Sequence, residues 1–216
     1  MGQNKKRFGG RLTRSFFQRS CVDVARDLVG CYFTRELKNG MRLVVRLVEV
    51  EAYLGDGSDP ASHAHRGETP RNRTMFGPPG HIYVYRSYGV HACANVVCSG
   101  KSAAAVLLRA AEPIDGIHLM RKHRALDDDT PNTTILRGPG NLCKALKLDV
   151  EDDGESLLSG AVSIHAPTNG SEALEIVVSK RIGITKAIDL PYRFFAANDP
   201  HVSGTRRKID DRRLQT

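Results

Sequence analysis

The sequence predicts a single domain of mixed α/β (α+β) class, built on a mainly antiparallel β-sheet with short helices around it. Three observations support this prediction: a length of 216 residues, a composition of 40% apolar and 26% charged residues, and short alternating segments separated by turn residues. A chain of this length can bury a hydrophobic core without disulfides or metals, and the composition is ordinary for a globular protein. Short strands mixed with a few helices indicate the mixed class.

The first elements follow from a capping signal and a hairpin signal. Ser20 can cap a helix over residues 21–28, because its hydroxyl can accept a hydrogen bond from the first helical turn. A strand over residues 31–37 then reaches Asn39-Gly40, a strong hairpin signal, and returns over residues 41–54. These two strands are therefore expected to pair in antiparallel fashion.

The later elements are shorter and follow a polar loop, rich in glycine and proline, at residues 55–80. A β-stretch over residues 82–97 is expected to turn near Ser99-Gly100 and to return over residues 104–110. Pro113 is expected to open a helix that reaches about Leu126, since proline is favoured in the first turn of a helix. Further elements are predicted at residues 142–146 (helix) and at residues 162–165, 174–178 and 193–196 (strands).

The charge is the unusual feature of the composition. Thirty-two Lys and Arg against 24 Asp and Glu give a net charge of +8, which favours an anionic partner, with nucleic acid ahead of a membrane surface. Residues 1–19 carry six cations and no acid, and residues 201–216 carry a net +3. We therefore predict a basic N-terminal tail (1–19), a central domain (20–204) and a basic C-terminal tail (205–216). The alternative for the tails is that their charge only solubilises the chain.

Several classes of protein do not fit the sequence. The longest apolar run, residues 103–108, is far short of the roughly 20 residues that a membrane span needs, and no secretory signal is expected. Five cysteines without a Cys-x-x-Cys pair favour a reduced, intracellular protein, in a bacterial cytoplasm or nucleoid or in a nucleus. His63 and His65 lack further ligands at metal spacing, and Asp56 and Asp59 near them are expected to be turn residues. No metal site is therefore predicted.

Two carboxylates stand out in the segment 41–54. If this strand is regular, Glu49, Glu51 and Tyr53 share one face with the apolar residues from Met41 to Leu47. A carboxylate at the end of an apolar face is costly unless it is paired or used. The alternatives are that both carboxylates reach solvent at the end of the strand, or that they pair with an arginine.

Tyrosines are concentrated in the next part of the chain. Four of the six tyrosines lie between Tyr53 and Tyr88, and Tyr83 and Tyr85 face the same way on a strand. Tyr88 is followed by Gly89, where the chain can turn. Such tyrosines often only pack in a core with their hydroxyls bonded. Aromatic rings interleaved with arginines also suit the stacking of bases beside a held phosphate backbone.

The order of these motifs resembles the alkyladenine (3-methyladenine) DNA glycosylase family over residues 15–204. The resemblance implies a curved antiparallel sheet, distinct from the helix-hairpin-helix glycosylases. It also implies a monomeric enzyme without a cofactor that removes damaged purines from double-stranded DNA. The motifs are Val50-Glu51-Ala52-Tyr53-Leu54-Gly55, Thr69-Pro70-Arg71-Asn72-Arg73, Met75-Phe76, Tyr83-Val84-Tyr85, Tyr88-Gly89, Leu107-Leu108-Arg109-Ala110, Gly138-Pro139 with Leu142-Cys143, Arg181-Ile182-Gly183, Arg193-Phe194 and Pro200-His201-Val202-Ser203.

The resemblance implies a role for particular residues. Glu51 is the general base that activates water for attack on the sugar C1′, with Arg109 and the carbonyl of Val202 orienting that water or the nearby backbone. The remaining roles are stacking on the flipped base (Tyr53, His63 and Tyr85), exclusion of normal guanine (Asn95), insertion into the emptied stack (Tyr88) and contact with the DNA backbone (Thr69, Arg71 and Arg73). No catalytic lysine is implied, so strand cleavage is not expected.

Expected substrates are 3-methyladenine and 7-methylguanine, whose cationic bases leave readily. Activity on the neutral bases hypoxanthine and ethenoadenine stays open, because the sequence contains no evident acid to protonate them. Two alternatives remain at this point. One is a non-catalytic module on the same fold that binds damaged DNA, and the other is a hydrolase of free nucleosides or small glycosides.

Overall fold

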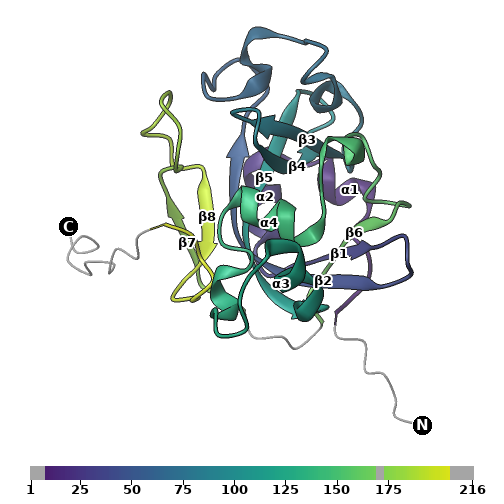
Figure 1. Ribbon diagram of the computed structural model, residues 1–216. Helices are drawn as coiled ribbons and strands as arrows, with labels where there is room; N and C mark the ends of the chain where they lie inside the picture. Colours follow the sequence, from purple (N-terminus) through teal and green to yellow (C-terminus); the bar gives the residue numbers. More distant parts are fainter. Residues whose placement is uncertain (1–7, 169–172, 205–216) are drawn as a thin grey trace, which may run out of the picture.

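The computed structural model describes residues 8–168 and 173–204. In the described residues, eight strands form one sheet whose main path runs β3-β4-β5-β2-β1-β6, and β8 joins β2 to β7. Every pairing is antiparallel, and Figure 1 shows the sheet strongly curled with short helices beside it. The predicted mixed α/β domain with a curved antiparallel sheet is confirmed. The strands are β1 (Tyr32–Glu36), β2 (Arg42–Tyr53), β3 (Ile82–Ser87), β4 (His91–Cys98), β5 (Ala104–Asp115), β6 (Val162–His165), β7 (Ile176–Ser179) and β8 (Arg193–Ala196).

The helices are short; α2 and α4 pack against the sheet, and α3 packs against α4. Helix α2 packs on β2 and β5, whereas α4 packs on β4 and β5. In the described part of the chain, no helix is long and apolar enough to cross a membrane. The helices are α1 (Arg14–Phe17), α2 (Cys21–Leu28), α3 (Ile117–Arg124) and α4 (Pro139–Leu146), with 3-10 turns η1 (His63–Arg66), η2 (Arg73–Phe76), η3 (Asn132–Thr134) and η4 (Val150–Asp152).

The local signals near the N-terminus are confirmed. The Ser20 hydroxyl accepts a hydrogen bond from the backbone N–H of Asp23 at 3.2 Å, which caps α2 at its first turn. Between β1 and β2, the side chain of Asn39 accepts a hydrogen bond from the N–H of Met41, and Gly40 adopts a φ of 79°. Glycine tolerates this left-handed conformation, so the predicted hairpin forms.

The β-stretch predicted over residues 82–97 is divided into two strands, because the chain turns at Tyr88-Gly89, where the sequence indicated that a turn is possible. Strands β3 and β4 are separate and form a hairpin in which Tyr83 pairs with Asn95. Its tip is made by Tyr88, with a φ of 49°, and Gly89, with a φ of 72°. Two successive positive φ angles are typical of the tight turn that joins two antiparallel strands. The tyrosine beside the glycine therefore lies at an exposed tip.

Pro113 does not open a helix, contrary to the expectation from sequence. It lies near the end of the long strand β5 and pairs with Val45 beside a register shift in the β2–β5 ladder. Proline cannot donate to a ladder and is tolerated at such irregular positions near a strand end. The chain leaves the strand at Gly116, with a φ of 76°, and the helix begins at Ile117.

The ends of the chain were predicted as basic tails. Residues 8–19 of the N-terminal segment pack on the sheet: Phe17 of α1 is fully buried, and Arg11 bridges to His165 at the end of β6. Residues 1–7 and 205–216 lie outside the described residues. Of the shorter elements, β6 and β8 form at the predicted positions, α4 begins three residues earlier than predicted, and β7 lies at Ile176–Ser179.

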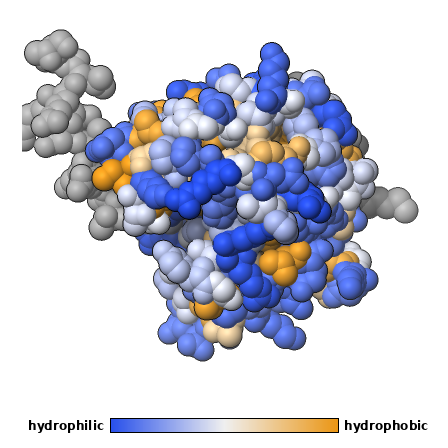
Figure 2. Space-filling view, turned by 90° about the horizontal axis from the view of Figure 1, so that it is seen from above, coloured by the Kyte–Doolittle hydropathy of each residue, from blue (hydrophilic) through white to orange (hydrophobic). Residues whose placement is uncertain are grey.

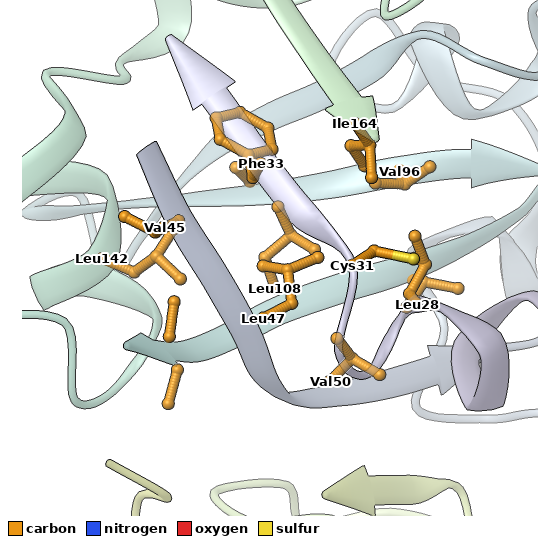
Figure 3. Packing of buried hydrophobic residues seen from close by; sticks show 14 of the residues in the cluster. Leu28, Cys31, Phe33, Val45, Leu47, Val50, Val96, Leu108, Leu142 and Ile164 are labelled. Carbon is orange, nitrogen blue, oxygen red and sulfur yellow. The ribbon is translucent and has the colours of Figure 1, made fainter. Parts of the chain in front are cut away.

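The core lies between the sheet and the helices. Figure 3 shows side chains from β1, β2, β4, β5, β6 and helices α2 and α4 meeting in one apolar cluster. All five cysteines are buried, and none of them forms a disulfide. The residues of the apolar cluster that Figure 3 labels are Leu28, Cys31, Phe33, Val45, Leu47, Val50, Val96, Leu108, Leu142 and Ile164.

Candidate active site

A β-bulge in β2 changes the face that its carboxylates occupy. Leu47 pairs with Ala111 and Glu49 with Ala110, so Val48 is an extra residue in the ladder. The core face accordingly passes from Leu47 to Val48 and continues through Val50. Glu49, Glu51 and Tyr53 thus lie on the side of the strand opposite the core cluster, and the expectation that they continue the apolar face is wrong.

Glu51 is fully buried at a point where β2 is a central strand. It pairs with Leu107 of β5 on one side and with Arg193 of β8 on the other. Of the two alternatives for the carboxylates, solvent exposure is excluded and pairing with arginine is observed. Both Glu49 and Glu51 form ion pairs with Arg109, at 3.0 and 3.2 Å.

Arg109 reaches both carboxylates because of a second bulge. Ala110 pairs with Glu49 and Leu108 with Val50, which leaves Arg109 as the unpaired residue between them. Such a bulge re-aims a side chain. The Arg109 Nε atom donates to Glu49, and the Nη1 atom donates to Glu51.

Three donors surround the Glu51 carboxylate. The Tyr53 hydroxyl donates to Oε2 at 3.0 Å, the backbone N–H of Ile182 donates to Oε1 at 2.7 Å, and Arg109 completes the set. Burial nevertheless raises the pKa of Glu51, against the lowering influence of Arg109 and of the two hydrogen bonds, while the nearby Glu49 charge adds to the rise. A carboxyl with a raised pKa can take a proton from water more readily than an ordinary one.

Glu49 joins this site to the C-terminal part of the described chain. Its Oε1 atom also accepts from Arg193 Nε at 2.7 Å, and its Oε2 atom accepts from the backbone N–H of Ser203 at 2.6 Å. The preceding carbonyl, that of Val202, accepts a hydrogen bond from Arg137 Nε at 3.0 Å. A carbonyl has two lone pairs, so this contact leaves one acceptor position available. The Val202 carbonyl, which the family resemblance implies as an acceptor for the water, therefore directly precedes Ser203, whose N–H donates to Glu49.

A cavity of about 680 Å³ lies beside this carboxylate network. Tyr53, which donates to Glu51, lines the cavity, and so does Gly183, which follows the Ile182 donor. A cavity of this size with aromatic walls and a few polar groups is typical of a site for a small planar ligand. The predicted residues His63, Tyr85, Asn95, Tyr88 and Arg71 also line it, together with Ala61, Met75, Tyr83, Arg86, Ser87, Gly89 and Ile184.

The aromatic wall is fixed by mutual contacts. The rings of His63 and Tyr85 meet edge to face with centroids 4.4 Å apart, and Tyr83 stacks on Tyr85 at 5.4 Å. His63 Nδ1 lies 3.0 Å from the Tyr83 hydroxyl. Burial and the nearby Arg71 charge lower the pKa of His63, so its imidazole is neutral at pH 7. Tyr83 is buried and its hydroxyl is hydrogen-bonded, which is the alternative that expected such tyrosines to pack in a core.

Asn95 lies on β4 at the back of the cavity and is buried. Its side-chain amide donates to the backbone carbonyl of Tyr83 at 3.1 Å, which fixes the orientation of the amide. A rigid polar group at this place can discriminate between purines that differ in an exocyclic substituent.

The loop at residues 55–80 forms the upper part of this face in Figure 1 and carries the predicted backbone-contacting residues. Asn72 organises the loop by donating to the carbonyls of His63 and Gly67 and by accepting from Thr69. Arg71 reaches the cavity, whereas Arg73 is exposed and pairs with Glu68. Figure 2, which looks onto this face, shows mostly hydrophilic residues with apolar residues in small groups.

Tyr88 is the most exposed aromatic residue at the site. Its side chain is 94% exposed at the tip of the β3–β4 hairpin, where it borders the cavity. A large ring exposed at the tip of a hairpin has no packing role in the isolated chain. It is therefore available for contact with a partner.

A buried ion pair that the sequence did not indicate lies beside Tyr53. Asp59, expected to be a turn residue, is fully buried and binds Arg181 through two hydrogen bonds of 2.6 and 2.8 Å. The expectation that Asp59 is a turn residue is confirmed, because its side chain accepts from the N–H of Ala61 and its carbonyl accepts from the N–H of Ser62. Its ion pair with Arg181 was not predicted. The available signal was the Arg181-Ile182-Gly183 motif.

Comparison with known proteins supports the same assignment. Residues 15–200 match the profile of the methylpurine-DNA glycosylase family. The chain belongs to that family. As a member, it is a DNA glycosylase, a hydrolase of N-glycosidic bonds, and the resemblance seen in its motifs is confirmed.

Relatives of similar length are found in archaea and bacteria, where they are named provisionally as 3-methyladenine DNA glycosylases. The protein of Methanoculleus marisnigri is 45% identical over 89% of this chain and 98% of its own length. That of Agrobacterium fabrum is 46% identical over 91% of this chain and 94% of its own length. That of Carboxydothermus hydrogenoformans is 43% identical over 89% of this chain and 98% of its own length.

The glycosylase site contains no evident metal ligands. In residues 8–168 and 173–204, no group of three or more His, Cys, Asp or Glu side chains is placed to hold a metal ion. His63, one member of the weak His63–His65 pattern, is instead engaged with the Tyr83 hydroxyl and the Tyr85 ring.

Proposed function

We propose that this glycosylase is a monofunctional enzyme that flips alkylated purines out of duplex DNA and hydrolyses their N-glycosidic bond with a water activated by Glu51. The observation that supports this best is a fully buried carboxylate, Glu51, bonded to Tyr53 in the wall of an aromatic cavity. Flipping is required because the sugar carbon that is attacked lies inside the base stack. The names of the relatives point to 3-methyladenine as one substrate.

The chemistry follows from the groups around Glu51. Water attacks C1′ of the deoxyribose and gives a proton to Glu51, while the bond between C1′ and the purine nitrogen breaks and its electrons leave with the base. The products are the free base and an abasic sugar. The transition state carries positive charge on the sugar, which a nearby carboxylate stabilises. The Val202 carbonyl and Arg109 are the groups proposed to orient the water.

Recognition of the base is proposed for the cavity. The flipped purine would lie between Tyr53 on one side and His63 and Tyr85 on the other, with Asn95 excluding normal guanine. A cationic alkylated base suits such a site, because aromatic faces attract positive charge. Thr69, Arg71 and Arg73 would hold the DNA backbone, and Tyr88 would fill the space that the base leaves.

Release of free bases from duplexes tests the proposal directly. We expect the protein to release 3-methyladenine and 7-methylguanine from methylated duplex DNA and to leave intact abasic strands. Binding to these duplexes without release would indicate the DNA-binding module instead. Release from free nucleosides that is equal to that from duplex and insensitive to salt would indicate the nucleoside hydrolase, since DNA binding weakens steeply as salt rises.

The raised pKa of Glu51 predicts the acid side of the pH profile. The carboxylate form is the active base, so activity is lost as the pH falls through the pKa of Glu51 in the folded enzyme. Because burial raises this pKa, with Arg109 opposing the rise, half-maximal kcat/KM is expected at a higher pH than an exposed glutamate would give. The measurement is kcat/KM for 7-methylguanine release against pH, with unfolding followed over the same range. A rate that stays constant down to the ordinary glutamate range would contradict the role of Glu51.

Removal of the exposed ring at the hairpin tip tests the proposed insertion into the stack. Tyr88→Ala is expected to weaken binding to a duplex with an abasic site by about tenfold, since stacking of one aromatic ring on a base contributes about 1–3 kcal/mol. The melting temperature should not change, because the side chain is 94% exposed. Met41→Ala, at the β1–β2 hairpin, is the control and should leave binding unchanged. Equal binding by both variants would show that Tyr88 does not contact the DNA.

A further inference from the structure

A guanidinium lies behind the ring of Tyr53. The Cζ atom of Arg181 is 4.6 Å from the centroid of this ring. The Arg181 side chain is fully buried and does not line the cavity, whereas Tyr53 does. The ring therefore separates the guanidinium from the cavity, and whatever stacks on the cavity face of Tyr53 has Arg181 on the far side.

Arg181 forms a direct ion pair with Asp59, and the charge of Glu51 also acts on its guanidinium at longer range. Asp59 faces it with both oxygens, at 2.6 Å from Nη1 and 2.8 Å from Nη2, and its side chain is fully buried as well. Arg181 Nη1 also donates to the carbonyl of Ala52, which precedes Tyr53 in β2. The carboxylate of Asp59 and the guanidinium of Arg181 thus hold the end of β2 and the ring of Tyr53 in place. A pair buried in this way is neutral, but removal of one partner leaves an uncompensated charge.

The sign of the charge behind the ring matters for a cationic ligand. The face of an aromatic ring attracts a cation through its quadrupole. A purine alkylated at N7 or N3 carries a positive charge while it is attached to the sugar. An uncompensated guanidinium on the opposite face would repel that base across a distance of less than about 10 Å, a separation at which two charges still interact in a buried site.

We propose that Asp59 and Arg181 are specificity-determining residues that act through Tyr53. Arg181 holds the ring as a fixed wall of the cavity, and Asp59 neutralises the guanidinium so that the ring can stack on a cationic purine. Neither residue touches the base, so both are positioning residues. The inference rests on the proposed function, because it takes the cavity as the site of a flipped base.

Two duplexes that differ only in the charge of one base test this inference. One contains 7-methylguanine and the other its neutral isostere 7-methyl-7-deazaguanine, each on a 2′-fluorinated sugar that resists hydrolysis. The measured quantity is the ratio of their dissociation constants at fixed salt. Asp59→Asn is expected to reduce the preference for the cationic base by roughly tenfold, with binding of the neutral isostere unchanged.

The opposite substitution should have the opposite effect. Arg181→Gln leaves the Asp59 carboxylate behind the ring and is expected to increase the preference for the cationic base. The double variant, Asp59→Asn with Arg181→Gln, has no net change in charge and should return the ratio to that of the wild type. A purely structural role would weaken binding of both duplexes equally and in the same direction for both single variants.

Several outcomes would overturn the inference. They are an equal loss of affinity for both duplexes, the same direction of change in both single variants, or an altered ratio in the double variant. Thermal unfolding checks that each variant folds, and if one single variant does not fold, the ratio measured with the other single variant still decides between the two roles. Failure of the wild type to release methylated purines would contradict the proposed function, whereas release with an unchanged ratio would contradict only the roles of Asp59 and Arg181.

Discussion

Glu51→Gln is expected to lower the single-turnover rate constant for release of 7-methylguanine from duplex DNA by about 10²–10⁴-fold. Glutamine has nearly the same shape as glutamate, but it cannot accept a proton from water or stabilise positive charge on the sugar. Glu51 is fully buried and contacts Tyr53, Arg109 and Ile182, so the variant changes the chemistry at a well-defined place. Binding of the damaged duplex should persist, because Glu51 does not line the cavity itself.

Glu112→Gln is the matched control for this result. Glu112 lies in β5 of the same sheet and pairs with Arg46 at 2.7 Å, away from the cavity. We expect it to release bases at the rate of the wild type. Release by Glu51→Gln at that same rate would show that another group activates the water, even though the family assignment would stand.

Arg109→Met is expected to reduce the free energy of unfolding at pH 7 by about 3–5 kcal/mol, because it leaves two buried carboxylates without their shared cation. Glu49 retains Arg193 and the N–H of Ser203, so most of the cost should fall on Glu51. Loss of the guanidinium also removes the influence that opposes the rise in the pKa of Glu51. Chemical denaturation of the wild type and the variant measures the difference.

The pH dependence of the loss in free energy of unfolding caused by Arg109→Met identifies the cause of that loss. With Arg109 absent, the pKa of Glu51 in the folded state rises further above its value in the unfolded state. A carboxyl of this kind favours the folded state when it is protonated, and this stabilisation is lost as the pH rises through the folded-state pKa. The deficit of Arg109→Met should therefore shrink at acidic pH. A deficit that is constant with pH would indicate lost packing instead, and Lys180→Met, which breaks the exposed pair with Asp189, should change stability little at any pH.

Elements with a strong local signal could be predicted from the sequence. The cap at Ser20 and the turn at Asn39-Gly40 place α2, β1 and β2 within one or two residues of their positions. Each signal depends on a side chain or a glycine that stabilises one backbone conformation without help from distant residues. Tyr88 with Gly89 is the weaker case, because its turn needs a positive φ at a tyrosine, which only the pairing of β3 with β4 enforces.

Where sequence and structure differ, long-range pairing decided the outcome. Pro113 is a good first residue of a helix, yet the β2–β5 ladder extends past it as far as Asp115. Val48 and Arg109 each occupy a bulge, and a bulge cannot be seen in the alternation of one strand because it is defined against the partner strand. For this reason, the alternation within β2 predicted the wrong face of the strand for Glu49 and Glu51.

The candidate site likewise contains features that the sequence indicated and features that only long-range contacts decide. The sequence pattern alone indicated that Glu51 and Tyr53 point to one side of a strand, and it indicated a run of tyrosines beside arginines. It also predicted the turn residue at Asp59, but it did not indicate the ion pair of Asp59 with Arg181, because the two residues lie 122 positions apart in the chain. Roles for Arg109, Val202 and His63 followed from the family resemblance and stay proposals.

The sequence by itself determined the class of the fold and the family, because composition, hairpin signals and the order of motifs are properties of the chain. Only the tertiary structure decided what surrounds the reactive carboxylate. Glu51 receives its donors from Tyr53 two residues away, from Arg109 of β5 and from Ile182, 131 residues along the chain. The pKa of Glu51 depends on burial by these distant segments and on the bulge that aims Arg109, so it arises only when the sheet has closed around them.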